Sequence, residues 1–298
     1  MKNIDFIGDI HGYADALVSL LETLGYSKID GTYTHPANRK VVFVGDFIDR
    51  GPKIRETLHI VKNMCDAGTA FAVMGNHEYN AICYHRKSDK TGMPFREHTQ
   101  NNIFQHKETV SQFKEYPEEW KMFLSWFERL PIWIETEDFR VVHAYWNEDA
   151  IAYLKYPVQN FTSDFLDLCA AKGTDENLYV EYLLKGAEYD LPLGVSYFDA
   201  QGHKRYKSRV MWWNTVLENA TYNDLLIACP PQIQHNYINN LDNQFVYVDE
   251  KPIVFGHYWL NGEPVITNPN AICIDYSIAK KGKLVSYALD TKSFTYVN

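Results

Sequence analysis

Three short clusters of acids, histidines and amides stand out in this sequence, and each directly follows an apolar run. Two single histidines follow later apolar runs, so the full set is Asp9 with His11, Asp46 with Asp49 and Arg50, Asn76 with His77 and Glu78, His143, and His257. Oxygen and imidazole groups of these types are ligands for divalent first-row metals. No cysteine joins the set, which argues against a thiolate zinc site. These residue types indicate a metal site with an arginine beside it.

The second cluster shows how the chain would position such a site. Residues 41–44 form an apolar run that is typical of a strand buried on both faces, and Gly45 permits a sharp exit from it. Asp46, Asp49 and Arg50 then follow within six residues of the run. In open α/β sheets, ligands bind at the carboxyl ends of the strands. We therefore expect two acids and one cation at such an end.

The same pattern of strand, loop and helix occurs three times near the start of the chain. The apolar spacing predicts strands at 3–8, 40–45 and 69–74, with helices at about 13–24 and 53–67. A repeated strand–loop–helix unit predicts a parallel sheet with crossover helices. The carboxyl ends of parallel strands meet at one edge, so the first three clusters should converge there.

The later chain is less regular. Residues 79–107 show no clear period and are expected to form a loop or lid. The remaining expectations are two helical pieces within 108–130 that break near Pro117, a hairpin at 132–142, a largely helical insertion at 150–208, and strands at 252–255, 271–274 and 284–289.

Each candidate residue has an ordinary structural alternative. Asp9 could cap a helix, Asn76 could occupy a tight turn, and Arg50 could form a surface salt bridge. A single histidine after a strand, such as His143, is more often a hydrogen-bonded core residue than a ligand. These alternatives must together explain polar clusters after five apolar strands, and we favour the shared site.

At this point the sequence resembles a known family. Gly8-Asp9-Ile10-His11-Gly12, Gly45-Asp46-Phe47-Ile48-Asp49-Arg50-Gly51 and Gly75-Asn76-His77-Glu78 resemble the three signatures of the calcineurin-like metallophosphoesterases. The Asp-Arg-Gly ending resembles the phosphoprotein phosphatase branch, which includes bacterial phosphatases and symmetrical dinucleoside tetraphosphatases. Val142-His143-Ala144 and Gly256-His257 match the two later single-histidine blocks of the family.

The resemblance implies a fold for most of the chain. We expect a four-layer αββα sandwich with two central mixed β-sheets and an active site at the carboxyl ends of the strands. Residues 1–298 would form a single metallophosphoesterase domain, with inserted segments at 79–130 and 150–250 that form a helical cap.

The resemblance also implies a role for each matching residue. Asp9 and His11 would bind a first metal ion, Asp46 would bridge two ions, and Asn76, His143 and His257 would bind the second. His77 would be the general acid and Asp49 would orient it. Arg50 and Asn76 would contact the phosphate.

The sequence departs from the family pattern at two places. His143 is followed by Tyr145-Trp146, and His257 is followed by Tyr258-Trp259, where relatives have smaller residues or a further histidine. These aromatic residues could narrow the cleft. A second phosphate-binding arginine is expected between the two late histidines, and Arg209 is the first candidate, although a surface arginine is an equal alternative.

Composition limits the classes of partner. The formal net charge is −9, which argues against a nucleic acid or an anionic membrane held by bulk charge. The five cysteines are scattered and include no C-x-x-C pair. With no apolar run near the length of a membrane span and no secretory signal, we expect a cytoplasmic protein.

The resemblance implies a binuclear-metal phosphoesterase that hydrolyses phosphomonoesters by in-line attack of a metal-bridging hydroxide. Its substrate would be a phosphorylated small molecule, a nucleotide or a phosphoprotein. The alternatives are a dinucleoside polyphosphate hydrolase, a phosphodiesterase of the same superfamily, or a catalytically silent binding scaffold. The ions would be two divalent metals, with Mn²⁺ preferred and Fe, Zn or Ni as alternatives.

Overall fold

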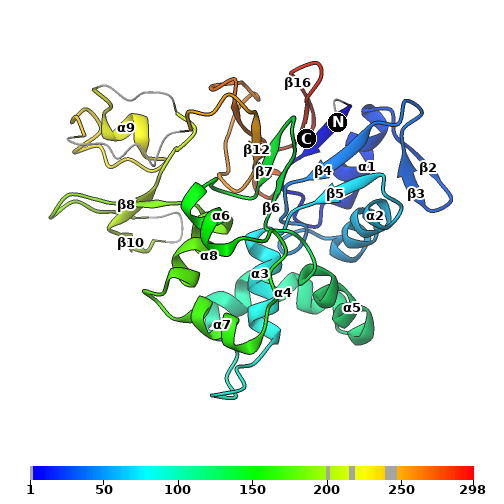
Figure 1. The fold of residues 1–298 in the computed structure, drawn as a ribbon, viewed down its shortest axis with the longest axis horizontal. Coiled ribbons are helices and arrows are strands. Elements are labelled where there is room, and N and C mark those ends of the chain that lie inside the picture. Colours follow the sequence, from blue (N-terminus) through cyan, green and yellow to red (C-terminus); the bar gives the residue numbers. More distant parts are fainter. Residues whose placement is uncertain (1–2, 199–201, 215–218, 239–246) are drawn as a thin grey trace.

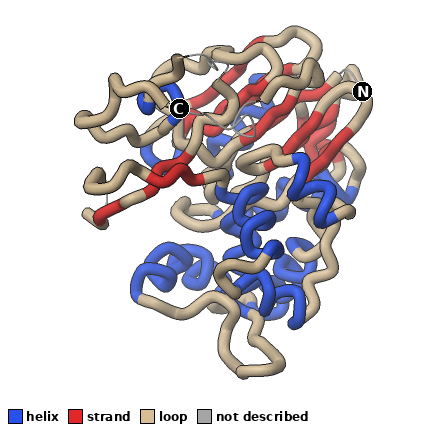
Figure 2. The backbone as a smooth tube through the Cα atoms, turned by 60° about the vertical axis from the view of Figure 1, so that its left-hand side comes forward, coloured by secondary structure: helices blue, strands red, loops and turns tan. Residues whose placement is uncertain are grey.

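The computed structural model describes residues 3–198, 202–214, 219–238 and 247–298, and it has a mixed α/β architecture (Figure 1). Two mixed sheets occupy its centre. The first has the strand order β14-β15-β1-β4-β5, with β16 paired to β15, and the second has the order β13-β12-β7-β6. Figure 2 shows the strands of the central sheets together at one end of the molecule and most of the helices at the other.

The first sheet contains the three predicted parallel strands. β1 pairs with β4, and β4 pairs with β5, both in parallel register. β15 runs antiparallel along the other edge of β1. The strands are β1 (Ile4–Ile7), β4 (Lys40–Phe43), β5 (Ala70–Ala72), β14 (Asp275–Tyr276), β15 (Lys283–Ala288) and β16 (Ser293–Val297).

The second sheet is built from the later chain. β12 is parallel to both β7 and β13, whereas β6 and β7 form the predicted antiparallel hairpin. Its strands are β6 (Trp133–Glu135), β7 (Arg140–Val142), β12 (Ile253–Phe255) and β13 (Ala271–Cys273).

The two sheets pack against each other through every second side chain. Phe6 of β1 and Val42 of β4 lie in one buried cluster with Val141 of β7 and Val254 of β12. The intervening side chain Phe43 points away, into the larger core cluster. Because side chains alternate across a strand, each central strand is buried on both faces. Residues 41–44 are fully buried, as their apolar run predicts.

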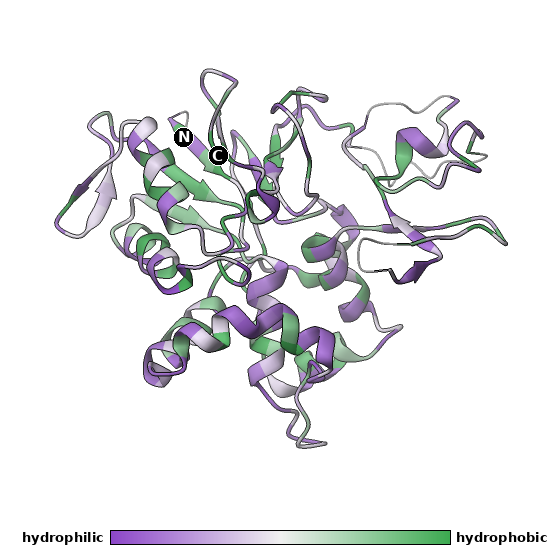
Figure 3. Ribbon diagram, turned by 180° about the vertical axis from the view of Figure 1, so that it is seen from behind, coloured by the Kyte–Doolittle hydropathy of each residue, from purple (hydrophilic) through white to green (hydrophobic). Residues whose placement is uncertain are grey.

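Two amphipathic helices cover the outer face of the first sheet. α1 (Ala14–Thr23) contacts β15 and β16, and α2 (Ile54–Asp66) contacts β5. Figure 3 shows apolar residues on the strands and along single faces of these helices. A helical layer on the second sheet, which the four-layer sandwich requires, stays a prediction.

The prediction of a loop or lid at 79–107 is wrong over about half of its length. α3 (Asn76–His85) and α4 (Gln100–Phe113) occupy much of this segment, and α5 (Pro117–Phe127) follows. The two helical pieces expected near Pro117 are α4 and α5. The apolar side chains of α3 do not form a clear stripe, because the first residues of this helix belong to one of the polar clusters. The helical period of α3 was therefore not visible in the sequence.

The segment after β7 is only partly helical. Three helices come first, and short paired strands then replace the helical pattern. The elements are α6 (Glu148–Leu154), α7 (Ser163–Ala170), α8 (Asp175–Lys185), β8 (Glu188–Asp190), β9 (Tyr197–Phe198), β10 (Lys204–Arg205), β11 (Lys207–Arg209) and α9 (Tyr222–Leu225). A further hairpin, β2 (Ser27–Ile29) with β3 (Thr32–Thr34), follows α1. Parts of the predicted insertion at 150–250 lie outside the described residues.

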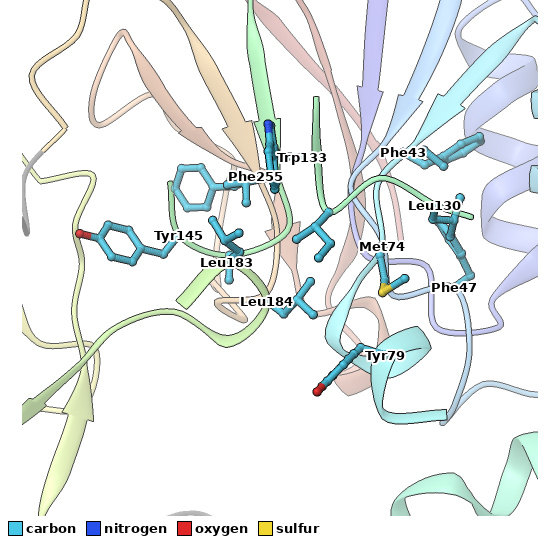
Figure 4. Packing of buried hydrophobic residues seen from close by; sticks show 14 of the residues in the cluster. Phe43, Phe47, Met74, Tyr79, Leu130, Trp133, Tyr145, Leu183, Leu184 and Phe255 are labelled. Atoms are coloured by element: carbon cyan, nitrogen blue, oxygen red, sulfur yellow. The ribbon is translucent and has the colours of Figure 1, made fainter. Parts of the chain in front are cut away.

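The larger core cluster joins this segment to the sheets. Figure 4 shows Phe43 and Phe47 on one side of it and Leu183 and Leu184 of α8 on the other. Tyr145 also belongs to this core and is only 1% exposed. Tyr145 and Trp146 are as buried as the proposed ligand His143, so their suggested effect on the cleft stays a prediction.

Candidate metal centre

The strand ends of both sheets meet at one place, as the sequence predicts. His143, directly after β7, donates from Nδ1 to the carbonyl oxygen of Val44, after β4, at 2.7 Å. The backbone N–H of His257, after β12, donates to Asp9, after β1, at 3.1 Å. Asp9 therefore does not cap a helix, and these bonds connect the two sheets.

The loop after β4 follows an uncommon path. Asp46, Asp49 and Arg50 all have positive φ angles, of 54°, 67° and 72°. Gly45 lies against Gly75, where a Cβ would come within 2.5 Å of the Gly75 backbone nitrogen. Such backbone conformations cost free energy and persist where the surroundings fix them.

Hydrogen bonds to Glu78 hold much of the loop after β4 in place. This fully buried side chain in the first turn of α3 accepts from the backbone N–H groups of Asp46 and Phe47, both at 2.8 Å, and of Gly75 at 3.0 Å. We assigned no role to Glu78 from the sequence. Its place at the third position of a helix, where an acid can reach back to the cap, was the available signal.

Asp46 lies at the centre of two groups of potential metal ligands. Its carboxylate lies near His11 and His77 in one group, and near His143 and His257 in the other, with all ligand atoms of a group within 4.8 Å of one another. The nearest ring nitrogens lie 3.4 Å (His143) and 3.6 Å (His11) from the Asp46 oxygens. One carboxylate therefore faces two ligand groups, as a bridging ligand must.

Two of the histidines, His11 and His257, present unprotonated nitrogens to this space. His11 donates from Nδ1 to the carbonyl oxygen of Ile48 at 2.9 Å, and His143 donates likewise to Val44. A backbone carbonyl at Nδ1 leaves the lone pair on Nε2. The Nε2 atoms of His11 and His257 are buried and have no hydrogen-bond partner. Unpartnered, buried nitrogens of this kind fit divalent metal ions.

Asn76 adds an oxygen to the second group. Its Oδ1 lies 3.0 Å from Nε2 of His143 and 2.9 Å from Nδ1 of His257. Burial would lower the pKa of His143, but the neighbouring Asp46 outweighs burial and raises it. A protonated Nε2 of His143 can therefore donate to Asn76 Oδ1, and a divalent ion would replace that proton with both atoms as ligands.

The charges of the site favour cations as well. Burial and the neighbouring Asp275 raise the pKa of Asp9 well above its usual range. Burial and the neighbouring Asp46 raise the pKa of Glu78 to about 7. Burial, with His77 nearby, lowers the pKa of His11 to about 3 and keeps it neutral. Several buried acids beside neutral imidazoles are a suitable environment for divalent ions.

Asp9 is buried but lies outside both close ligand groups, whereas His77 lies within one of them. The sequence missed another acid of this edge, Asp275, which accepts from the backbone N–H of Trp259 at 2.7 Å. Asp275 also follows an apolar strand, β13, so the rule that found the other acids could have found it.

His77 and Asp49 form a close pair. Nδ1 of His77 lies 2.5 Å from Oδ2 of Asp49, and Nε2 of His77 faces the Nη2 atom of Arg50 at 3.3 Å. Burial raises the pKa of Asp49, but hydrogen bonds from His106 and His77 outweigh burial and hold its pKa well below its usual range. A charged carboxylate at Nδ1 leaves Nε2 as the nitrogen that faces the site.

Arg50 stacks on an aromatic residue at the rim. Its guanidinium lies 3.9 Å from the ring centre of Trp259, and the ammonium group of Lys280 lies 3.5 Å from the same ring centre. Tyr258, by contrast, is buried and its hydroxyl accepts from Trp212. Trp259 thus lies at the rim beside Arg50, whereas the Tyr258 ring packs against the ring of His257. The sequence missed Lys280.

Arg209 lies at the end of β11 and is half-buried. Its positive charge helps to lower the pKa of His257, after burial, which is the larger cause. Arg209 is thus close enough to act electrostatically on the second ligand group. The structure does not show a contact that would establish phosphate binding.

Among the described residues, no helix combines the length and apolar character that a membrane crossing requires.

Comparison with known proteins gives a family. The sequence model of the calcineurin-like phosphoesterases matches residues 2–258. Asymmetrical bis(5'-nucleosyl)-tetraphosphatase PrpE of Halalkalibacterium halodurans is 33% identical over 162 residues, which are 53% of this chain and 63% of the relative. The PrpE protein of Oceanobacillus iheyensis is 30% identical over 145 residues, 48% of this chain and 55% of the relative. The chain thus spans less than two thirds of the length of these relatives.

Solved structures give a weaker match. A cold-active protein-tyrosine phosphatase of a psychrophilic Shewanella species aligns over 100% of this chain and 81% of its own, with a TM-score of 0.49 and 17% identity. A likeness at this level supports no further conclusion.

Proposed function

The chain belongs to the calcineurin-like phosphoesterase family, and from this premise we propose that it is a metal-dependent phosphoesterase that hydrolyses phosphomonoesters. The observation that carries this proposal is the position of Asp46 between two groups of buried histidines. A single carboxylate with ligands on both sides is suited to two metal ions, and a two-metal site is suited to phosphate ester hydrolysis.

The residues that would hold the ions are those implied by the family resemblance. Asp46 would be shared, His11 and Asp9 would serve one ion, and Asn76, His143 and His257 would serve the other. When bound, two divalent ions supply a water of lowered pKa for in-line attack and neutralise charge on the phosphoryl oxygens. Mn²⁺ is the preferred ion, and Fe, Zn and Ni also suit these ligands.

The remaining residues would act on the substrate. Arg50 would bind two phosphate oxygens with its planar guanidinium. His77 would donate a proton from Nε2 to the leaving oxygen, and Asp49, which accepts from Nδ1, would hold the ring in the orientation for that transfer. The stacking of Arg50 on Trp259 would limit the directions in which the guanidinium can point.

A second candidate is a dinucleoside polyphosphate hydrolase. The observation that favours it is the pair of cations on Trp259, since Arg50 and Lys280 could bind neighbouring phosphates of one chain. The similarity to proteins named as bis(5'-nucleosyl)-tetraphosphatases supports it too. Phosphodiesterase activity is less favoured because Asp49 and Arg50 resemble the monoesterase branch.

Residues 1–298 would act as one catalytic domain, with the segments at 79–130 and 150–250 selecting the substrate. A silent scaffold would need neither unpartnered imidazoles nor a paired His77, and both are present.

The proposal is tested by turnover of metal-reconstituted protein on a panel of substrates. The panel contains p-nitrophenyl phosphate, phosphopeptides, nucleotides, dinucleoside tetraphosphates and bis(p-nitrophenyl) phosphate, and the metal content is measured on the same samples. We expect metal-dependent turnover of monoesters and none of the diester. Absence of turnover on every substrate at full metal content would contradict the enzyme assignment.

A further inference from the structure

The Asp49 carboxylate has more donors than its pairing with His77 requires. Oδ2 accepts from His77, but Oδ1 accepts from Nδ1 of His106 at 2.7 Å and from the hydroxyl of Thr109 at 2.5 Å. All four residues are buried, with Asp49 2% and His106 3% exposed. The two oxygens of this carboxylate therefore have separate tasks.

Both additional donors come from one face of α4. His106 and Thr109 are three residues apart, so they lie on the same side of the helix. Gln112, three residues further on, donates to the carbonyl oxygen of Gly51 at 3.0 Å and accepts from the backbone N–H of Ile54 at 2.6 Å. One stripe of α4 thus binds the loop after β4 from Asp49 to the start of α2.

His106 is itself held from its far side. Its Nε2 lies 3.1 Å from Nε2 of His85, on α3. Burial, followed by the charge of His106, lowers the pKa of His85 to about 4, so His85 is neutral near pH 7. The rings of Tyr84 and Trp120 also contact the His106 ring. With Nδ1 on the carboxylate and the ring enclosed, His106 has one orientation.

The arrangement has a consequence for His77. A carboxylate held by a single hydrogen bond can rotate about its Cβ–Cγ bond and change which oxygen it offers. Two donors at Oδ1 oppose that rotation and keep Oδ2 directed at Nδ1 of His77. We propose that His106, supported by Thr109, is a positioning residue that fixes Asp49 and thereby the ring of the general acid. This inference rests on the proposed function, in which His77 donates the proton.

A purely structural role for His106 makes a different prediction. In that case, substitution would lower stability and reduce turnover of all substrates equally. A positioning role instead reduces turnover most where the leaving oxygen needs a proton. Phenyl phosphate has a poor leaving group and 2,4-dinitrophenyl phosphate a good one, so the ratio of their kcat values separates the two roles.

The test compares two substitutions of His106 that put a hydrogen-bond donor at different positions. Asn carries its amide nitrogen near the position of imidazole Nδ1, and Gln carries it near the position of Nε2. His106→Asn should keep a donor to Asp49 and leave the kcat ratio within about threefold of wild type. His106→Gln should change the ratio by roughly 10–100-fold, the range for groups that orient a functional histidine. Thr109→Val, which keeps the side-chain shape, should shift the ratio in the same direction by less.

A second readout is independent of turnover. ¹⁵N-histidine NMR of the metal-free protein should show a hydrogen-bonded Nδ1–H on His77 in wild type and in His106→Asn. That resonance should shift or broaden in His106→Gln and, to a smaller extent, in Thr109→Val. Because both readouts are also made on Thr109→Val, the inference stays testable if a His106 variant fails to fold.

The controls separate the possible failures. His59→Asn alters an exposed histidine on α2 that contacts Glu119, and it should change neither the kcat ratio nor the His77 resonance. An equal loss on both substrates in His106→Gln, with an unchanged His77 resonance, would overturn the positioning role. If His77→Asn shows no dependence on the leaving group, the proposed general acid itself fails.

Discussion

Asp46 and Asp49 lie three residues apart in one loop, and both are buried and have positive φ angles, yet their surroundings differ. One backbone N–H, that of His77, donates to Oδ1 of Asp46 at 3.0 Å. The nearest histidine ring nitrogens lie 3.4, 3.6 and 3.9 Å from the Asp46 oxygens. The donors to Asp49 lie at 2.5, 2.5 and 2.7 Å. The ring-nitrogen distances at Asp46 are too long for hydrogen bonds of normal strength, and the distances at Asp49 are short.

The difference indicates that the two carboxylates are held in place in different ways. Around Asp49 the protein itself provides every donor, so this carboxylate is positioned before anything binds. Around Asp46 the side-chain nitrogens stand back from the carboxylate, and two imidazole nitrogens lack any partner. We infer that the protein completes the Asp49 side alone, whereas the Asp46 side requires cations.

Replacement of Asp46 should have the largest effect. Asp46→Asn removes the charge between the two ligand groups, so turnover should fall to the level of metal-free protein. Added Mn²⁺ should raise the Tm of wild type and of Asp49→Asn, but not that of Asp46→Asn, because only a ligand that binds the folded state stabilises it. Calorimetry with and without metal provides the measurement, and an equal Tm rise in all three proteins would contradict the comparison.

Removal of His77 should have the next largest effect. His77→Asn should lower kcat by roughly 10²–10⁴ for phenyl phosphate, the usual contribution of a general acid. The loss should be much smaller for 2,4-dinitrophenyl phosphate, with metal content unchanged. If kcat fell equally for both substrates, His77 would be a metal ligand beside Asp46 and not the general acid.

The pH dependence of the unfolding free energy should reveal the contribution of Asp49 in the metal-free protein. Its pKa in the folded protein lies below the ordinary 3.8, so its ionised form stabilises the fold above about pH 4. This contribution is lost as the pH falls from there toward the lowered pKa. Asp49→Asn should therefore lower the unfolding free energy by about 1.5–3 kcal/mol at pH 7. Urea unfolding provides the measurement, and the difference in unfolding free energy between wild type and Asp49→Asn should be smaller at pH 3 than at pH 7. An equal difference at both pH values would exclude a stabilising role for the ionised Asp49.

The smallest effect is expected at Lys280 on the rim, since this residue belongs neither to the Asp46 group nor to the Asp49 group. Lys280→Met removes an exposed cation from Trp259, and an exposed ion pair contributes about 1 kcal/mol or less. KM for a dinucleoside tetraphosphate should rise up to about fivefold, whereas KM for p-nitrophenyl phosphate should not change. An equal rise for both substrates would mean that Lys280 does not distinguish phosphate chains.

The sequence predicted the frame of the site well, because its signals are local. The apolar runs before Asp9, Asp46 and Asn76 indicated parallel strands, and parallel strands place their following residues together. The hairpin before His143 and the strand before His257 were also predicted and are confirmed.

What the sequence could not indicate depends on contacts between distant segments. His106 lies in a stretch without a clear apolar period, and the helical period predicted around Thr109 did not indicate a polar contact. The reason is that α4 buries polar residues against Asp49. Glu78 was read as part of a motif, but its bonds to the Asp46 loop span 32 residues. Tyr145 and Trp259 are both aromatic and both follow a histidine block, and only packing shows that one is core and the other rim.

The pairing of β1 with β15 affects how the chain can be synthesised. β1 is made long before β15, yet one of its two edges pairs with this later strand, which ends at Ala288, in the register Asp5 to Ala288. Until that strand emerges from the ribosome, an apolar edge of the growing chain has no partner, and open edges of this kind promote aggregation. A chain shortened before Lys283 should therefore be recovered mainly as insoluble aggregate, and slow translation of the segment that contains β15 should lengthen the dependence on chaperones.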